Sequence, residues 1–197
     1  MDDVDDAAII ARSSEEPELF ATVFDRHFSQ IRVFLQRRIG EDADDLAADV
    51  FSIAFQRRDR FQAVHRSALP WLYGIASNLV SRHRRSEIRT LRALARLQSA
   101  EPGEDESERV AERVHASSLR LPLFEALAKL HARDRDALLL VAWEELTYEE
   151  VAVALEIPVG TVRSRLNRAR HLIRTTIAGG DGEAPPQARR LMGGLDV

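Results

Sequence analysis

Five polar residues recur three and four positions apart in one stretch of helical periodicity: Arg163, Ser164, Asn167, Arg168 and His171. The apolar residues between them follow the same period, so the polar set should face away from the core. Arginine can donate two hydrogen bonds to a guanine edge, and asparagine can pair with an adenine edge. Three flanking arginines could hold phosphates: Arg165, Arg170 and Arg174. This face predicts a helix that reads DNA.

The segment before this face supplies the element that should position it. Thr147 and Glu150 have the spacing of a capping box that opens a short helix, and Pro158 follows a brief break in the chain. A short helix, a tight turn and a longer helix over about 159–177 make a helix-turn-helix, whose second helix enters the major groove. A solvated basic helix and a helix that binds membranes or acidic proteins remain open alternatives from this pattern alone.

Helical periodicity continues through the rest of the chain. Apolar residues predict helices over about 20–39, with Gly40 as the stop, over about 42–58, and from Pro70 onward. Further helices are expected over 121–130 and from Asp134, which could cap its helix. No β alternation of useful length appears, so the fold class is all-α.

An acidic, Pro-Gly-containing stretch divides this pattern into two small helical domains. We expect an acidic arm over 1–17, a first domain over 18–98 and a flexible acidic linker over 99–117. A second domain should occupy 118–178, followed by a disordered tail over 179–197.

Composition excludes several classes of function. The chain has 197 residues, a net charge of −4, six histidines and no cysteine, so thiolate chemistry is excluded. The histidines are scattered without metal-ligand spacing, and no phosphate-binding glycine loop appears, so neither catalysis nor a cofactor or metal is predicted. No apolar run is long enough to cross a membrane, and the acidic start is unlike a secretory signal, so a cytoplasmic protein is expected.

Two segments resemble one family. The run from Leu146 to Ala152, with that from Pro158 to Arg170, is similar to region four of the extracytoplasmic-function group of bacterial sigma factors. The run from Asp44 to Phe51 and that from Trp71 to Asn78 resemble region two of the same group. The segments come in the family's order, which a general helix-turn-helix repressor would not share.

The resemblance implies a site for each region. The helix with Thr161, Arg163 and Arg168 would read the minus-thirty-five element of a promoter. In region two, an acidic face at Asp45 and Asp49 would dock on the clamp helices of the largest subunit of core RNA polymerase, and the second-largest subunit would also be contacted. Ala48 departs from the family there, since glutamine is common at this position.

The minus-ten element would be read and melted by region two. The residues carried over for this role are His65, Asn78, Arg82 and Arg85. Arg82 stands where the family often has aspartate, and Trp71 is expected in the core rather than against a base. An anti-sigma factor that clamps the two domains is also implied, with no direct membrane contact. The competing hypothesis is a dimeric helix-turn-helix regulator that binds palindromic DNA without polymerase.

Overall fold

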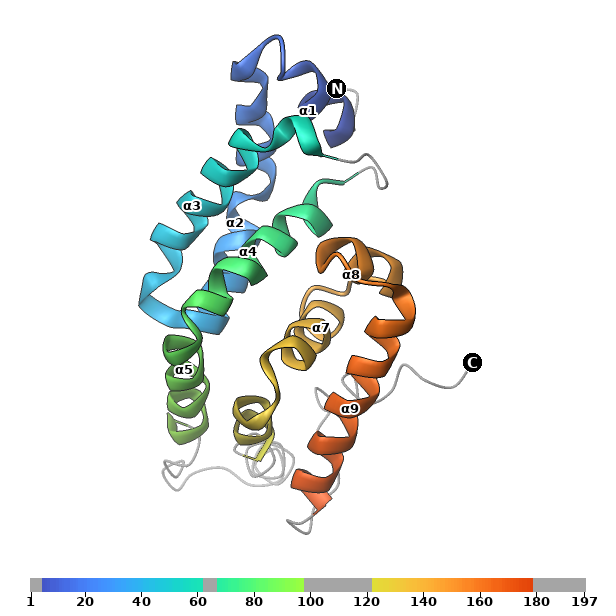
Figure 1. Ribbon diagram of the computed structural model, residues 1–197. Helices are drawn as coiled ribbons and strands as arrows, with labels where there is room; N and C mark the ends of the chain where they lie inside the picture. Colours follow the sequence, from blue (N-terminus) through green and yellow to red (C-terminus); the bar gives the residue numbers. More distant parts are fainter. Residues whose placement is uncertain (1–4, 62–66, 98–121, 179–197) are drawn as a thin grey trace, which may run out of the picture.

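The computed structural model describes residues 5–61, 67–97 and 122–178, and within these ranges the chain forms helices and no strand (Figure 1). Residues 122–129 are also helical. The longer helices are α1 (Asp6–Arg12), α2 (Phe20–Ile39), α3 (Ala43–Gln56), α4 (Leu69–Arg82), α5 (Arg84–Leu97), α7 (Ala132–Ala142), α8 (Tyr148–Ala154) and α9 (Val159–Ala178). Three short 3-10 turns lie at Pro17–Leu19, Gly40–Asp42 and Arg58–Arg60. The all-α prediction is confirmed.

The first half of the chain is built around α2, α3 and α4. Their apolar faces meet, and Phe34, Val50 and Leu72, one from each helix, are fully buried. The helix α2 ends at Gly40, which adopts a φ of 74°, a left-handed conformation that favours glycine. α5 packs on α2 and buries Leu91. The three-helix core predicted from the spacing of apolar residues is therefore present, with α5 added to it.

α1 lies in the stretch that we expected to form an acidic arm, and it packs against α2 with Ile10 buried. The buried Asp6 carboxylate accepts hydrogen bonds from Arg26 at 2.9 Å and from the Ala68 backbone N–H at 2.9 Å, and lies 2.6 Å from His27 Nε2. Burial alone would raise the pKa of Asp6, but these hydrogen bonds and the His27 charge outweigh it and lower that pKa. One carboxylate thus ties α1 to α2 and to the start of α4.

The second half consists of residues 122–129, α7, α8 and α9 around a core that includes Leu138, Val151 and Val162. The predicted capping box is confirmed: the Glu150 N–H donates to Thr147 Oγ1 at 3.2 Å, and the Thr147 N–H donates to Glu150 Oε2 at 2.8 Å. The expectation that Asp134 caps α7 is wrong. The N-cap is His131, which accepts from the Arg133 N–H, because Asp134 already lies in the first helical turn.

The two halves pack directly against each other, with α4 lying on α8 and α7 (Figure 1). At Gly74, a β-carbon would meet the carbonyl oxygen of Ala154 and lie 3.0 Å from its carbonyl carbon. Only glycine allows the backbones of α4 and α8 to approach this closely. We expected two domains held by a tether, and the predicted linker lies outside the described residues. The observed arrangement instead has a shared interface.

Candidate nucleic-acid and polymerase interfaces

The outer face of α9 carries the residues predicted to read DNA. Val162, Leu166, Ala169 and Ile173 form its buried stripe. The opposite side is exposed and holds Arg163, Ser164, Asn167, Arg168 and His171, while Thr161 and Arg165 at its edges are half-buried. The structure therefore brings these seven predicted residues together along one side of a single helix. With α8 before it, α9 has the position of the recognition helix in a helix-turn-helix.

Two arginines of α9 differ from the simple expectation. Arg168 is exposed, but its Nε and Nη2 donate to the two carboxylate oxygens of Asp134 at 3.2 and 2.8 Å. The hydrogen bonds and charge of Asp134 raise the pKa of Arg168. Arg170, which we expected to flank the DNA face, is instead buried, and its guanidinium donates to the Tyr148 hydroxyl at 3.4 Å. Arg170 is wrong as a phosphate contact because its position falls on the core side of α9.

A hollow of about 480 Å³ lies between the start of α7 and the first half of α9. Its basic lining comes from His131, Arg133, Arg165 and Arg168, with Asp134 paired to Arg168 at its wall. Sequence reasoning missed His131 and Arg133, because they precede the helix-turn-helix by many residues. In the sequence, only the cluster of charges around Asp134 marks these two residues. That cluster does not indicate a DNA-binding surface until the fold places α7 beside α9.

The acidic face of α3 is arranged as predicted. Asp45, Ala48 and Asp49 are exposed, while Leu46 and Val50 on the opposite side are buried. On neighbouring α2, Phe24 is 38% exposed, and its ring lies 5.0 Å from that of Phe51 on α3. Exposed charges such as Asp45 and Asp49 suit the polar rim of a protein interface.

Three of the four residues carried over for minus-ten recognition lie on α4 and α5. Asn78, Arg82 and Arg85 are all exposed. His65 lies outside the described residues. The Asn78 side chain is exposed. Its amide therefore does not need the hydrogen-bond partner within the protein that a buried amide would require. The surface is therefore accessible to a nucleic acid from the side of α4 that carries Asn78.

Asn78 opens into a hollow of about 470 Å³ between the two halves. The first half lines it with Arg57, Arg60, Phe61, Trp71, Asn78 and Arg82, and the second half closes it with Val153, Ala154 and Glu156. The Trp71 ring is half-buried and lies 5.1 Å from Phe61, so it is neither a full core residue nor freely exposed. Aromatic rings, an amide and several cations are the groups that hold unstacked bases.

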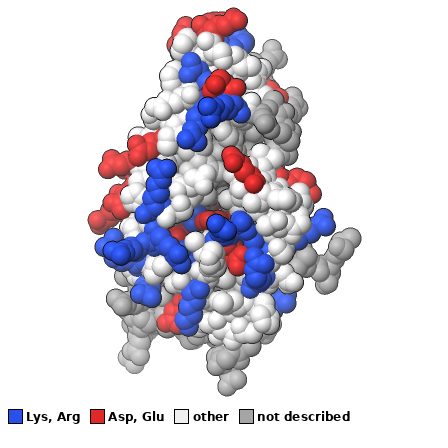
Figure 2. Space-filling model, viewed as in Figure 1, with Lys and Arg blue, Asp and Glu red and all other residues white. Residues whose placement is uncertain are grey.

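Basic side chains gather over the middle of the face shown in Figure 2, on both halves of the molecule, although the chain as a whole is acidic. Clustering of one sign of charge matters more for nucleic-acid binding than the net charge. Among the residues that the structure describes, no group of histidines and carboxylates could hold a metal ion. In the same ranges no helix is both long and apolar enough to cross a membrane.

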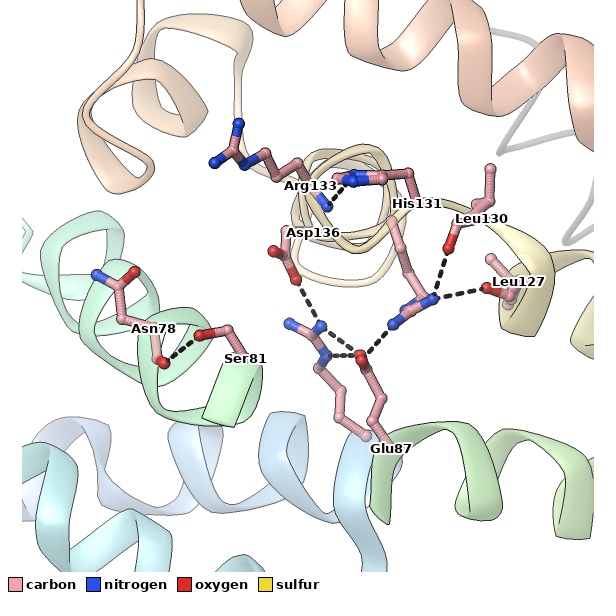
Figure 3. Close-up of polar contacts among 10 residues, drawn as sticks. Asn78, Ser81, Glu87, Leu127, Leu130, His131, Arg133 and Asp136 are labelled. Atoms are coloured by element: carbon pink, nitrogen blue, oxygen red, sulfur yellow. Dashed lines mark hydrogen bonds and ion pairs between the residues drawn. The ribbon is translucent and has the colours of Figure 1, made fainter. Parts of the chain in front are cut away.

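A network of buried ions crosses the interface between the halves (Figure 3). Arg38 of α2 donates to Glu87 of α5 through Nε at 2.8 Å and also through Nη2, which in addition reaches Asp136 of α7 at 2.5 Å. Arg135 of α7 donates to the second oxygen of Glu87 at 2.5 Å, and to the backbone carbonyls of Leu127 and Leu130. Arg38, Glu87 and Arg135 are 1%, 2% and 0% exposed.

Burial and charge act on the carboxylates of this network in opposite ways. Burial favours the neutral form of Glu87, but Arg38 and Arg135 outweigh it and lower the pKa of that carboxyl. Burial prevails at Asp136, whose pKa is raised despite the charge of Arg38. Beside the network, the Tyr73 hydroxyl of α4 donates to Glu144, which follows α7. Burial and this bond raise the pKa of Tyr73, and burial also raises that of Glu144.

Comparisons with known proteins agree with this geometry. Residues 23–90 match the family model of sigma-70 region 2, and residues 120–173 match that of sigma-70 region 4. The sigma factor HrpL of Pseudomonas syringae pv. syringae is 30% identical over 149 residues, which are 71% of this chain and 77% of that protein. The sigma factor SigC of Mycobacterium tuberculosis, of the extracytoplasmic-function group, is 36% identical over 131 residues, or 65% of this chain and 66% of that protein.

The fold also matches that of CnrH in a complex with the cytosolic domain of CnrY, with a TM-score of 0.56, 21% identity and coverage of 89% of this chain and 99% of that one. A helix-turn-helix that follows a region-two helical bundle along the chain defines a transcription initiation factor that directs RNA polymerase to promoters. The chain belongs to the sigma-70 family, in its extracytoplasmic-function group. The dimeric regulator, the competing hypothesis, is therefore not favoured.

Proposed function

We propose that this sigma factor uses three separate surfaces: the acidic face of α3 for core polymerase, α4 with α5 for the minus-ten element, and α9 for the minus-thirty-five element. The observation that carries the proposal is the exposed row of side chains on α9 whose chemistry suits base edges, in a chain that also matches sigma-70 region 2 over residues 23–90. A DNA-binding helix alone would suit any regulator. The additional acidic and basic faces of region two are what a polymerase-bound factor requires.

On α9, Arg163 and Asn167 are the residues we assign to base edges, with Ser164 and His171 beside them. Arg168 presents only part of its guanidinium, because Asp134 occupies Nε and Nη2. We assign Arg165 and Thr161, together with Arg133 across the hollow from them, to the DNA backbone. Phosphate contacts from two different helices would fix the angle at which α9 enters the groove.

In region two, Asn78 would bind an unstacked base, while Arg82 and Arg85 would track the phosphates of the opened strand. We retain His65 in this role by resemblance to the family. Asp45 and Asp49 would bind the clamp helices of the largest polymerase subunit, and the second-largest subunit would contact the chain elsewhere. Charges at the rim of such an interface act mainly on the rate and specificity of docking.

We further propose that region two extends over 18–98 and region four over 118–178, with a linker between them and a tail after them. The expected acidic arm over 1–17 contains α1, which packs on α2 as part of the first half. The protein acts in the cytoplasm without enzymatic activity of its own. An anti-sigma factor is a proposed partner, supported by the fold shared with the sigma factor RpoE of Bartonella quintana, whose structure was solved in complex with the anti-sigma factor NepR.

Run-off transcription from genomic fragments with core polymerase tests the proposed function. We expect promoter-specific transcripts that require this chain, and that Asp45→Ala and Arg163→Ala each weaken. Asp25→Ala on α2 and Arg12→Ala on α1, which change exposed residues away from these surfaces, serve as matched controls. If no fragment gives a transcript, and the chain alone binds a duplex site as a dimer, the proposal is refuted in favour of a conventional regulator.

A further inference from the structure

We propose that α1 sets the geometry of the minus-ten surface of region two, with Asp6 and Arg58 as positioning residues. The inference rests on the proposed function, because it gives a task in promoter recognition to a helix to which we assign no direct contact with DNA. The match to sigma-70 region 2 begins at residue 23, so α1 lies before it. The inference is carried by hydrogen bonds that join α1 to the turn after α3 and to the start of α4.

The first turn of α1 holds the residue from which α4 begins. Asp6 Oδ2 accepts a hydrogen bond of 2.9 Å from the Ala68 N–H, 62 positions later in the chain. Ala68 is the N-cap of α4 and is fully buried, so its N–H needs a partner within the protein. Its carbonyl accepts from the Leu72 N–H at 3.0 Å, which starts the hydrogen-bonded ladder of α4. A carboxylate beside a helix N-terminus also suits the helix dipole.

The Asp6 carboxylate is itself fixed by α2. Arg26 donates to its Oδ1 at 2.9 Å, and His27 Nε2 lies 2.6 Å from its Oδ2. Ile9 and Ile10 on the same helix are buried in the hydrophobic core. A carboxylate with three partners cannot turn away from one of them without disturbing the others. The start of α4 is therefore held at a fixed place relative to α2.

The other end of α1 holds the turn that follows α3. Arg58 in this turn donates through Nε to the Ser13 carbonyl at 3.2 Å and through Nη1 to the Phe55 carbonyl of α3 at 2.6 Å. Its guanidinium carbon also lies 4.1 Å from the centroid of the Phe55 ring. Ser13 is fully buried, and its hydroxyl donates to the Ile10 carbonyl at 2.6 Å. The carbonyl that accepts from Arg58 therefore has a fixed position at the end of α1.

The two segments held by α1 carry the aromatic rings of the minus-ten hollow. Phe61 follows the turn of Arg58, and its N–H donates to the Arg58 carbonyl at 3.2 Å. Trp71 lies in the first turn of α4, directly after the residues fixed by Asp6. The two rings lie 5.1 Å apart, and both line the hollow that holds Asn78. Because stacking depends on the separation and angle of the rings, the contacts of α1 control how this hollow receives a base.

One variant weakens the contacts at each end of α1. Asp6→Asn keeps the size of the side chain but removes the charge that its partners share. Arg58→Lys keeps the positive charge but loses the pair of hydrogen bonds to two carbonyls, because the planar guanidinium that makes both is gone. Loss of a phosphate contact therefore cannot explain an effect of Arg58→Lys. Asp25→Asn on α2 and Arg12→Lys on α1 make the same changes at exposed positions and are the matched controls.

Trp71 fluorescence reports on these contacts in the full chain without DNA. The sequence has two tryptophans, so Trp143→Phe leaves Trp71 as the only one that emits. In that background we expect Asp6→Asn and Arg58→Lys to shift the emission to longer wavelength and to speed its quenching by acrylamide. The two controls should change neither quantity, and far-ultraviolet circular dichroism should show that every variant keeps its helices. Unchanged emission and quenching in both variants would overturn the inference.

Binding of the chain with core polymerase to a single-stranded minus-ten oligonucleotide gives the second measurement. The probe comes from a promoter found by run-off transcription, and a scrambled strand and a minus-thirty-five duplex are the references. We expect both variants to bind the cognate strand about tenfold more weakly, as for loss of one stacked base, and to keep their affinity for the references. An equal loss on all three probes would make α1 a general stabiliser and overturn the inference. If the wild-type chain gives no transcript, the proposed function fails, and Trp71 fluorescence still tests the contacts of α1.

Discussion

Arg135 donates a hydrogen bond of 2.5 Å to Glu87, a residue 48 positions earlier in the chain and in the other half of the molecule. Glu87 also binds Arg38 of its own half, so a single carboxylate serves two arginines. None of the three side chains is more than 2% exposed. Glu87 is therefore the point where the internal packing of region two and the contact with region four depend on the same group.

Removing the charge of Glu87 should have a large effect. Glu87→Gln leaves two arginines buried with only a neutral partner, and breaking a buried ion pair in this way costs about 3–5 kcal/mol. We expect the free energy of unfolding to fall by about that amount in urea denaturation at neutral pH. The control is Glu41→Gln at an exposed position, which should stay within about 0.5 kcal/mol of the wild type. Equal stability of the two variants would contradict the role given to Glu87.

Asp6 should make stability depend on pH in the acidic range. Its folded pKa lies below the ordinary 3.8, so its ionised form is favoured by folding, and this contribution is present above that value. The stabilisation is lost as the pH falls through the lowered folded pKa. Asp6→Asn should therefore lower the free energy of unfolding by about 1–3 kcal/mol at pH 7, and by less near pH 3.

The matched control for Asp6 is Asp25→Asn, which changes an exposed aspartate of α2. Its effect should be small at both pH values. Thermal unfolding over a pH series measures both variants. A difference between Asp6→Asn and the wild type that does not shrink in acid would show that the carboxylate acts by shape rather than by charge.

Arg133 should contribute affinity for DNA without sequence preference. If it contacts a phosphate, Arg133→Gln weakens binding to a cognate minus-thirty-five duplex and to a scrambled one by the same factor, and lowers the salt slope by about one. Arg163→Ala should instead lower binding mainly to the cognate duplex, by about 1–3 kcal/mol. Fluorescence anisotropy over a salt series separates these outcomes. An unchanged slope for Arg133→Gln would remove the start of α7 from the DNA interface.

Asn78 should matter for opening the promoter. We expect Asn78→Ala to reduce run-off transcription from a duplex promoter by about tenfold or more, since base contacts of this kind are worth about 1–3 kcal/mol. On a template with a premelted minus-ten bubble the defect should be smaller, because strand separation is no longer needed. Ser81→Ala, at an exposed position of the same helix, is the control. Equal defects on both templates would assign Asn78 to a role other than melting.

Periodicity and capping chemistry were sufficient to predict α2, α3, α4, α7, α8 and α9, but not α1, which lies in the expected acidic arm, nor α5. The apolar stripe of α9 and the Thr147 capping box are local features, and each was confirmed. Arg170 shows the limit of such reasoning. It lies on the buried side of α9, but a buried arginine is rare enough that its charge suggested exposure. The hydroxyl of Tyr148, which accepts its hydrogen bond, comes from α8.

Contacts between distant segments could not be predicted from spacing. The arginine-carboxylate network joins α2, α5 and α7, and none of its four residues stands out from other charged residues in the sequence. Gly74 likewise gives no local signal, since it lies within a helix and its role depends on where Ala154 is brought. The hollow between α7 and α9 was missed for the same reason.

The shared carboxylate at Glu87 limits how freely the two regions can be exchanged between sigma factors. In a chimera whose region four carries an apolar residue in place of Arg135, Glu87 would keep Arg38 but lose its second partner, and Arg38 would lose Asp136 if that position also changed. Without region four, Arg38 would lose Asp136 and Glu87 would lose Arg135 as a partner. The two regions have separate tasks, but their interface residues must evolve together. A substitution in either region changes which residues are acceptable in the other.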